Sequence, residues 1–317
     1  NYRLKIMNKR IIFGGTPDFA AVHLKAMLEN GLRPEVVYTQ PDRPSGRGHK
    51  LTPSPVKVLA LEHGIEVRTP LNFKNEDDIK AFEELESDLF VVVAYGIILP
   101  ERIINSPKMG CINLHGSLLP KYRGAAPIQR ALLDGEEETG VTVMQIAKAL
   151  DAGNIYLKET LLISKEDTSG SLFEKLSILG SKTLVKSIPL ILDGKLEATP
   201  QDETLATYAA KLTKAESAIN FNETADEIEL KVRGLNPWPI ATLTKDKTVY
   251  KVFKAKAIKV AGEAGKIIEH NKQGLVIACK QDALLVEQIQ APGHKCVNAA
   301  DLIRSRPDLF SIGSFCD

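Results

Sequence analysis

An asparagine and a histidine lie two residues apart in the segment NLHGSLLPKYRGAAP, which runs from Asn113 to Pro127. Both side chains can donate hydrogen bonds, since the amide carries N–H groups and the imidazole carries one or two. Two donors that converge on one point stabilise an oxygen that gains negative charge during a reaction. No Ser-His-Asp motif surrounds the segment, and no second His stands at the spacing of a metal site. The pair therefore predicts a site that stabilises an oxyanion.

Asp151 is the third candidate for this site. It lies in the segment ALDAGNI, next to a turn that contains Gly153. An imidazole exchanges protons near neutral pH, and a nearby carboxylate can orient it. Asn113, His115 and Asp151 without a nucleophile are suited to direct acyl transfer, in which the attacking atom belongs to a substrate. Each residue also has a structural interpretation, because buried histidines and Asn or Asp turns are common.

Alternating strand and helix patterns fill the first two hundred residues and must position these side chains. The expected strands are Arg10–Gly15, Glu35–Thr39, Glu66–Arg68, Leu89–Gly96 and Gly110–Gly116, and the expected helices begin at Asp18 or span Val56–Gly64, Glu76–Glu86 and Thr168–Leu192. This alternation predicts the α/β class, with a doubly wound parallel sheet. Asn113 and His115 occupy alternate positions of one strand, so they project to the same face near its carboxyl end, where such sheets bind ligands.

The pattern changes after Ala206. A polar, weakly periodic stretch predicts a linker at about 195–213, and Ala225–Arg233 predicts a helix. From Ala241 onward, short alternating segments are separated by Gly, Asn and Asp, as in a small β-barrel. We therefore expect two domains, 1–206 and 214–317.

Composition excludes several classes of protein. The chain has a net charge of +1 and is 44% apolar, as in ordinary globular proteins. Its four cysteines are scattered without a C-x-x-C pair, which argues against a disulfide framework or a zinc cluster and favours a reducing cytoplasm. No apolar run approaches the roughly 20 residues of a membrane span. The start NYRLKI lacks the apolar core of a signal peptide, and Met7 is an alternative first residue.

Two basic segments suggest a polyanionic partner. The first is a strip of lysines in the second half of the chain: Lys245, Lys247, Lys251, Lys254, Lys256 and Lys259. The second is PDRPSGRGHK, at 41–50, which is too basic and too poor in apolar residues to pack into a core. The alternative for both segments is an ordinary solvated surface.

FGGTPDF, at 13–19, places glycines after the first strand as dinucleotide-binding proteins do. The full G-x-G-x-x-G pattern is absent, however, and Asp18 occupies the place where a phosphate would approach a helix N-terminus. A nicotinamide cofactor is therefore not expected.

The stretch NLHGSLLPKYRGAAPIQRAL is very similar to the signature of enzymes that transfer a formyl group from 10-formyltetrahydrofolate. TQPDRPSGRGHKLTPSPVK, VVVAYGIILP and LNPWPIA resemble the methionyl-tRNA formyltransferases within that family. The resemblance covers nearly the whole chain from Arg10. It implies a Rossmann-like catalytic domain, an OB-like C-terminal barrel, and formyl transfer to the methionyl amino group of initiator tRNA for translation initiation, without a metal.

The resemblance also implies roles for individual residues. Asn113, His115 and Asp151 would be catalytic. The folate would contact Tyr95, Gly96, Ile97, Ile98, Leu99, Ser117, Leu118, Leu119 and Pro120. Arg47 matches the loop arginine that reads tRNA in the family, and we add as tRNA contacts Arg43, Lys50, Lys245, Lys247, Lys251 and Lys254. We expect a monomer that binds tRNA and folate and no membrane.

Two alternatives stay open. The same signature occurs in glycinamide ribonucleotide and amino-sugar formyltransferases; the first usually lacks an equivalent second domain, and Arg47 with its loop must discriminate the second. An RNA-binding protein without catalysis is the alternative from another class, and the intact set of Asn113, His115 and Asp151 argues against it.

Overall fold

The computed structural model describes residues 9–45 and 50–317, so Arg47 and His49 lie outside the described residues. The chain forms two compact units. The first comprises residues up to Gly124, Glu138–Leu161 and Glu174–Tyr208, and the second comprises Ala125–Glu137, Leu162–Phe173 and Ala209–Asp317. The last change between units lies close to the predicted change at Ala206, but two earlier segments also pack with the second unit. The boundaries 1–206 and 214–317 stay a prediction.

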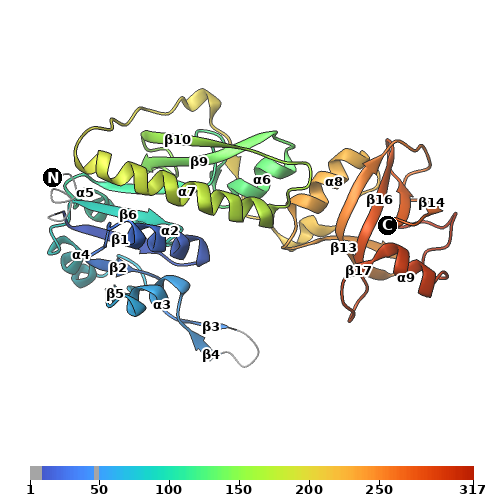
Figure 1. Ribbon diagram of the computed structural model, residues 1–317, viewed down its shortest axis with the longest axis horizontal. Helices are drawn as coiled ribbons and strands as arrows, with labels where there is room; N and C mark the ends of the chain where they lie inside the picture. The colour runs from blue at the N-terminus through green and yellow to red at the C-terminus, as the bar shows by residue number, and fades with distance from the viewer. Residues whose placement is uncertain (1–8, 46–49) are drawn as a thin grey trace. The chain divides into compact units, whose positions relative to one another are not determined.

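The first unit contains a mixed sheet with helices on both faces (Figure 1). Its strands are β1 (Ile11–Gly15), β2 (Val36–Tyr38), β3 (Arg43–Ser45), β4 (Lys50–Thr52), β5 (Glu66–Arg68), β6 (Leu89–Val93), β7 (Cys111–His115), β8 (Arg123–Gly124), β9 (Glu138–Gln145), β10 (Ile155–Leu162) and β11 (Tyr208–Ala209). Its helices are α2 (Asp18–Glu29), α3 (Pro55–Glu62), α4 (Glu76–Glu83), α5 (Glu101–Asn105), most of α7 (Ser169–Leu192) and the 3₁₀ helix η1 (Glu203–Leu205).

The central sheet has the strand order β10-β9-β7-β6-β1-β2-β5. The five strands from β7 to β5 are parallel, and their order is that of a Rossmann fold. The predicted α/β class with a Rossmann-like sheet is confirmed. One edge of this parallel-dominated sheet differs, because β9 pairs antiparallel with β7. Strands β9 and β10 were not foreseen.

Burial on both faces explains the long apolar strands. Every residue of β1 and β6 is buried, as expected for central parallel strands covered by helices. The face that carries Ile12, Phe90 and Val92 packs with Phe82 of α4 and Ile103 of α5. The opposite face is covered by α2 and α7. Asn113 lies beside Val92 in the register of β6 and β7. Because helices pack against this part of the sheet, the position of Asn113 is fixed.

The two glycines of FGGTPDF serve packing. A Cβ on Gly14 would lie 2.8 Å from the ring of Phe90, and a Cβ on Gly15 would lie 2.6 Å from Cβ of Ala20. Both glycines belong to β1 itself, so they allow close approach of helix and strand rather than forming a loop.

The second unit is an antiparallel sheet with two helices packed on it. It contains α6 (Pro127–Leu133), the 3₁₀ helix η2 (Lys214–Ser217), α8 (Ala225–Gly234), β12 (Ala241–Lys245), β13 (Thr248–Ile258), β14 (Ile267–His270), β15 (Leu275–Ala278), β16 (Ala283–Gln290), β17 (Val297–Asn298) and α9 (Ala299–Ser305). The strand order is β12-β13-β16-β15-β14, and β17 pairs with β16. A separate C-terminal antiparallel domain is therefore confirmed.

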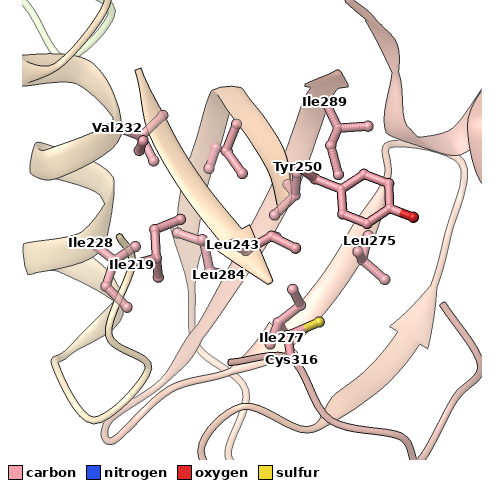
Figure 2. Close-up of a cluster of buried hydrophobic side chains, with 14 of the residues drawn as sticks. Ile219, Ile228, Val232, Leu243, Tyr250, Leu275, Ile277, Leu284, Ile289 and Cys316 are labelled. Atoms are coloured by element: carbon pink, nitrogen blue, oxygen red, sulfur yellow. The ribbon is translucent and has the colours of Figure 1, made fainter. Parts of the chain in front are cut away.

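The C-terminal residues join the two edges of this sheet. Asp317 exchanges both main-chain hydrogen bonds with Thr244 of β12. Cys316 donates to the carbonyl of Gly265, and Ile267 of β14 donates to the carbonyl of Ser314. The predicted barrel is thus closed by the chain end. Its interior holds aliphatic side chains from α8 and the strands (Figure 2). The ring of Tyr250 lies against that of Phe310 at a centroid distance of 4.9 Å.

His23 is a buried imidazole under helix α7. Its Nδ1 lies 2.6 Å from the carbonyl oxygen of Phe19, which can only accept, so Nδ1 carries the hydrogen. Its Nε2 has no hydrogen-bond partner in the described part of the chain. A Cβ on Gly180 would lie 2.8 Å from that atom, so the helix backbone covers it closely. Burial lowers the pKa of His23 from 6.5 to about 4, and the bond to Phe19 opposes this only in part.

We expect acid to destabilise the first unit through His23. Between about pH 6.5 and pH 4 the unfolded chain binds a proton that folded His23 does not, so stability falls as pH falls through this window. Across this whole window the free energy of unfolding should fall by about 3 kcal/mol. Thermal unfolding of wild type and His23→Asn, measured from pH 7.5 to pH 4.5, checks it: the Asn variant should lose less stability with acid. Equal slopes for the two proteins would contradict the assignment.

Candidate active site

Asn113 and His115 lie at the carboxyl end of β7 and share one face of the strand. Asn113 is half-buried, and its side chain makes no hydrogen bond to any described residue. His115 is 6% exposed, and its Nε2 lies 2.8 Å from the carbonyl oxygen of Tyr122. The prediction that the two side chains project together is consistent with this geometry. Asn113 offers a free amide, and His115 is held by the main chain.

The contact with Tyr122 determines the tautomer of His115. A carbonyl oxygen only accepts hydrogen bonds, so Nε2 of His115 carries the hydrogen and Nδ1 is the site that gains or loses a proton. Nδ1 lies 3.7 Å from Oδ2 of Asp151. This separation exceeds a hydrogen bond but places a carboxylate next to the atom that becomes positive. Tyr122 thus orients the ring, and Asp151 faces its other nitrogen.

Asp151 is presented by the loop between β9 and β10. Its φ of +49° is in the left-handed region, which costs a non-glycine residue about 1 kcal/mol or more. Its Oδ2 accepts a hydrogen bond of 2.8 Å from the main-chain N–H of Gly124. Gly153 allows the loop to pack closely against β9, since a Cβ there would lie 1.8 Å from the carbonyl oxygen of Gln145. Three segments therefore meet at this carboxylate: the loop of Asp151 itself, the main chain at Gly124, and the end of β7 with His115.

The segment 117–120 lines the same edge of the sheet. Ser117 and Leu119 are fully buried, while Leu118 and Pro120 are partly exposed. The hydroxyl of Ser117 donates to the carbonyl of Lys121 over 2.7 Å. Thr142 of β9 fixes the turn, because its hydroxyl donates to the carbonyl of Ser117 over 2.7 Å and accepts from the N–H of Leu119 over 3.1 Å. Folate contacts of this segment stay a prediction, and Leu118 and Pro120 are its accessible members.

The loop after β6, residues 94–100, lies one strand away. The carbonyl oxygen of Tyr95 accepts from the hydroxyl of Thr16 over 2.8 Å and from Nε2 of Gln40 over 2.9 Å. One oxygen thereby joins the loops after β1, β2 and β6. Gly96 has a φ of +77°, and a Cβ there would lie 2.2 Å from Nε2 of Gln40. This glycine is required by both its conformation and its neighbour.

Beyond Gly96 the loop keeps polar main-chain groups available. Within the described residues, the N–H and C=O groups of Ile97, Ile98 and Leu99 make no hydrogen bond. Ile98 is 93% exposed, whereas Ile97 and Leu99 pack partly against the core. The phenol of Tyr95 is buried in that core and is not accessible. Such a loop offers an apolar surface and unpaired backbone donors and acceptors to a flat polar ring.

The basic segment at 41–50 rests on a described two-stranded ribbon. Arg43 pairs with Thr52, and Ser45 pairs with Lys50, so only residues 46–49 lie between the paired ends. Arg43 and Lys50 are exposed. Nζ of Lys57 lies 2.9 Å from Oδ1 of Asp42 and anchors the base of the ribbon. Arg47 lies outside the described residues, so its role stays a prediction.

The lysine strip divides into accessible and paired members. A bulge between Val252 and Lys254 changes the alternation of β13, so Lys251 and Lys254 both point outward. Lys247 lies exposed in the hairpin turn before β13. Lys254 lies 3.5 Å from Glu287, and Lys259 lies 2.7 Å from Asp282.

Lys245 is a correction to the predicted RNA surface. It is 6% exposed and pairs with Asp246. It follows Ala241 and Leu243 at alternate positions of β12, so its side chain projects inward with theirs. That alternation was the signal available in the sequence. Lys245 is therefore not available to a phosphate.

Sequence reasoning also missed Arg123, Gln201 and Glu203. Arg123 is 2% exposed and forms two hydrogen bonds with the carboxylate of Glu203, of 2.9 and 2.7 Å. This carboxylate raises the pKa of the guanidinium. Gln201 and Glu203 lie in the stretch expected to be a linker, where no periodicity marks them.

The described residues contain no group of three His, Cys, Asp or Glu side chains placed to hold a metal. None of their helices could cross a membrane.

Known proteins resemble the chain over nearly all its length. Residues 8–188 match the family described as formyl transferase, and residues 211–307 match the formyl transferase C-terminal domain. The methionyl-tRNA formyltransferase of Pseudomonas fluorescens (strain SBW25) is 48% identical over 305 residues, which are 96% of this chain and 96% of that protein.

Solved structures share the fold at lower identity. An N-formyltransferase from Helicobacter canadensis, in complex with folinic acid and dTDP-3-aminofucose, superposes with a TM-score of 0.68 and is 22% identical. The match covers 88% of this chain and 98% of that one. HypX from Aquifex aeolicus, in complex with tetrahydrofolic acid, gives a TM-score of 0.60 at 16% identity, with 93% of this chain and 46% of that one covered. At these identities the similarity shows only that the fold is shared.

Proposed function

Since the chain belongs to the formyl transferase family, we propose that it transfers the formyl group of 10-formyltetrahydrofolate to the amino group of initiator methionyl-tRNA. The observation that carries the reaction is the placement of Asn113, His115 and Asp151 at one edge of the sheet without a nucleophile among them. The acceptor follows from relatives named methionyl-tRNA formyltransferase that match 96% of the chain.

The chemistry requires no covalent enzyme intermediate. The methionyl amine attacks the formyl carbon, the new C–N bond forms, and the bond from that carbon to N10 of the folate then breaks. The amide of Asn113 and the protonated Nδ1 of His115 donate to the carbonyl oxygen while it carries negative charge. Asp151 stabilises the imidazolium and helps to remove the proton of the attacking amine, and a proton returns to N10.

The loop after β6 fits the folate ring. A pterin presents donors and acceptors along a flat edge, and the unpaired main-chain groups of Ile97, Ile98 and Leu99 are of the matching type. The exposed side chain of Ile98 offers an apolar contact to the rest of the molecule. We propose that Tyr95, Ser117 and Leu119 shape this site from within, since their side chains are buried.

Two surfaces are proposed to hold the tRNA: the ribbon with Arg43, Arg47 and Lys50, and the strand face with Lys247, Lys251 and Lys254. In this proposal residues 1–206 form the catalytic domain and 214–317 the tRNA-binding domain of a monomer. All four cysteines are free, which is compatible with work in the cytoplasm.

Neutralising Lys247, Lys251 and Lys254 with Gln should weaken tRNA binding and flatten its salt dependence. The slope of log K against log salt should decrease by about one for each phosphate that the variant no longer neutralises. The KM for tRNA should rise while kcat changes little, because phosphate contacts position rather than react. A matched variant with Lys165, Lys272 and Lys295 changed to Gln removes the same charge elsewhere on the second unit. Equal slopes in the two variants would contradict the assignment.

The acceptor is tested by a transfer assay with two substrates run in parallel. Purified protein with 10-formyltetrahydrofolate should formylate initiator methionyl-tRNA and leave a nucleotide-linked amino sugar unchanged. The reverse preference would replace the proposed function with amino-sugar formylation; the N-formyltransferase from Helicobacter canadensis was solved in complex with dTDP-3-aminofucose.

A further inference from the structure

Gln201 holds the loop that presents Asp151. Its Nε2 donates one hydrogen bond of 2.8 Å to the carbonyl oxygen of Asp151 and another of 2.8 Å to that of Gly153. Its Oε1 accepts from Nη2 of Arg123 over 2.8 Å and from Nε over 3.2 Å. Because a guanidinium only donates, this contact determines which end of the amide is oxygen. Both N–H groups of Gln201 are then directed at the Asp151 loop.

Arg123 reaches Asp151 by two routes. Its side chain orients Gln201, which binds the main chain of Asp151. The main-chain N–H of its neighbour Gly124 donates to the Asp151 carboxylate over 2.8 Å. Arg123 is 2% exposed, and a buried guanidinium is costly unless its donors are paired. Gln201 and Glu203 supply those acceptors, so the arginine is fixed in one orientation.

Asp151 needs such support. Its φ of +49° is a conformation that an isolated loop leaves readily. Its Oδ2 must stay 3.7 Å from Nδ1 of His115 to act on the charge there. A small displacement of the carboxylate would exchange that interaction for water.

We propose that Arg123 and Gln201 are positioning residues for Asp151, which they hold in its strained conformation beside His115. The kinetic consequence rests on the proposed formyl transfer. The geometric consequence does not rest on that function, because it concerns only the hydrogen bond from the Gly124 N–H to the Asp151 carboxylate. A purely structural role, fastening residues 199–208 to the rest of the first unit, would lower stability without changing the rate per folded molecule.

The test compares Gln201→Glu, Gln201→Leu and Arg123→Lys with wild type. Gln201→Glu keeps an acceptor for Arg123 but loses both donors to the Asp151 loop. Gln201→Leu removes both contacts without adding charge, and it replaces the Glu variant if that one does not fold. Arg123→Lys keeps the charge but loses the fork that reaches Gln201 and Glu203 together. Glu197→Gln is the matched control, a charge change at an exposed position of the same segment.

We expect kcat to fall on the order of 10- to 100-fold in the three variants, with folate affinity and the KM for tRNA unchanged. Hydrogen exchange at the Gly124 amide should accelerate about tenfold or more, because its carboxylate acceptor is no longer held. Glu197→Gln should match wild type in both measurements. Unchanged kcat per folded molecule together with unchanged exchange at Gly124 would overturn the proposal. If wild type itself formylates no tRNA, the proposed function fails, and the exchange measurement alone still decides the positioning role.

Discussion

Replacing Asn113 with Ala should lower kcat for formyl transfer on the order of 100- to 1,000-fold, because one of two donors to the oxyanion is removed. His115→Ala should lower it further, since it removes both a donor and the group that exchanges the proton. Asp151→Asn keeps an acceptor for the N–H of Gly124 but removes the charge that faces Nδ1 of His115. We expect a loss of similar size to that of Asn113→Ala. Single-turnover rates with saturating folate and tRNA measure these effects.

Two controls separate chemistry from folding. Folate binding should persist in all three variants, because the loop after β6 makes the proposed contacts. His294→Ala, at an exposed histidine of the second unit, should leave the rate unchanged. If Asn113→Ala or Asp151→Asn kept near wild-type turnover, that residue would have no place in the mechanism.

Arg47→Leu should strongly impair formylation of methionyl-tRNA and leave folate affinity intact. Gly46 and Gly48 flank Arg47, so the chain there accepts conformations closed to other residues. The ribbon β3–β4 supports the segment from both sides, and the pair of Lys57 with Asp42 fixes its base. A guanidinium presents a planar fork of donors that suits phosphates and bases. We expect a fall in kcat/KM for tRNA of about 100-fold or more, as for removal of a desolvated charged group.

Arg47→Lys is the matched control for this prediction. If Arg47→Lys is as active as wild type, a positive charge is sufficient at this position. If it is as impaired as Arg47→Leu, the planar donor set of the guanidinium is required. Loss of folate affinity in Arg47→Leu, equal to the loss of formylation, would mean that the loop shapes the catalytic site. Full activity of Arg47→Leu would favour an amino-sugar acceptor instead.

Local pattern was sufficient for much of the sheet. The apolar run at Leu89–Val93 and the segment Cys111–His115 are strands because a parallel sheet buries both faces, and that burial shows in composition. The antiparallel edge β9–β10 was not visible, since strand direction depends on the partner strand and not on local residues. The inward position of Lys245 could have been inferred from alternation, whereas the bulge in β13 could not.

The candidate site was predictable in its residue types but not in its support. Asn113 and His115 share a face because a strand alternates, and this requires no tertiary information. The approach of Asp151 to His115 depends on a loop 36 positions later in the sequence. The roles of Arg123 and Gln201 depend on a contact between residues 78 apart. A polar stretch without periodicity is typical of a linker, and only the folded structure shows that Gln201 and Glu203 in it pair with the buried Arg123.

One measurement tests the central claim most directly: 10-formyltetrahydrofolate labelled at the formyl carbon is mixed with the protein, and initiator methionyl-tRNA is added afterwards. The account predicts that no label becomes attached to the protein before the tRNA arrives. It predicts that label then appears on the methionyl amine in step with consumption of the folate, and that His115→Ala abolishes this transfer. Label bound covalently to the protein, or methionyl-tRNA that stays unformylated, would contradict direct transfer at the edge formed by Asn113, His115 and Asp151.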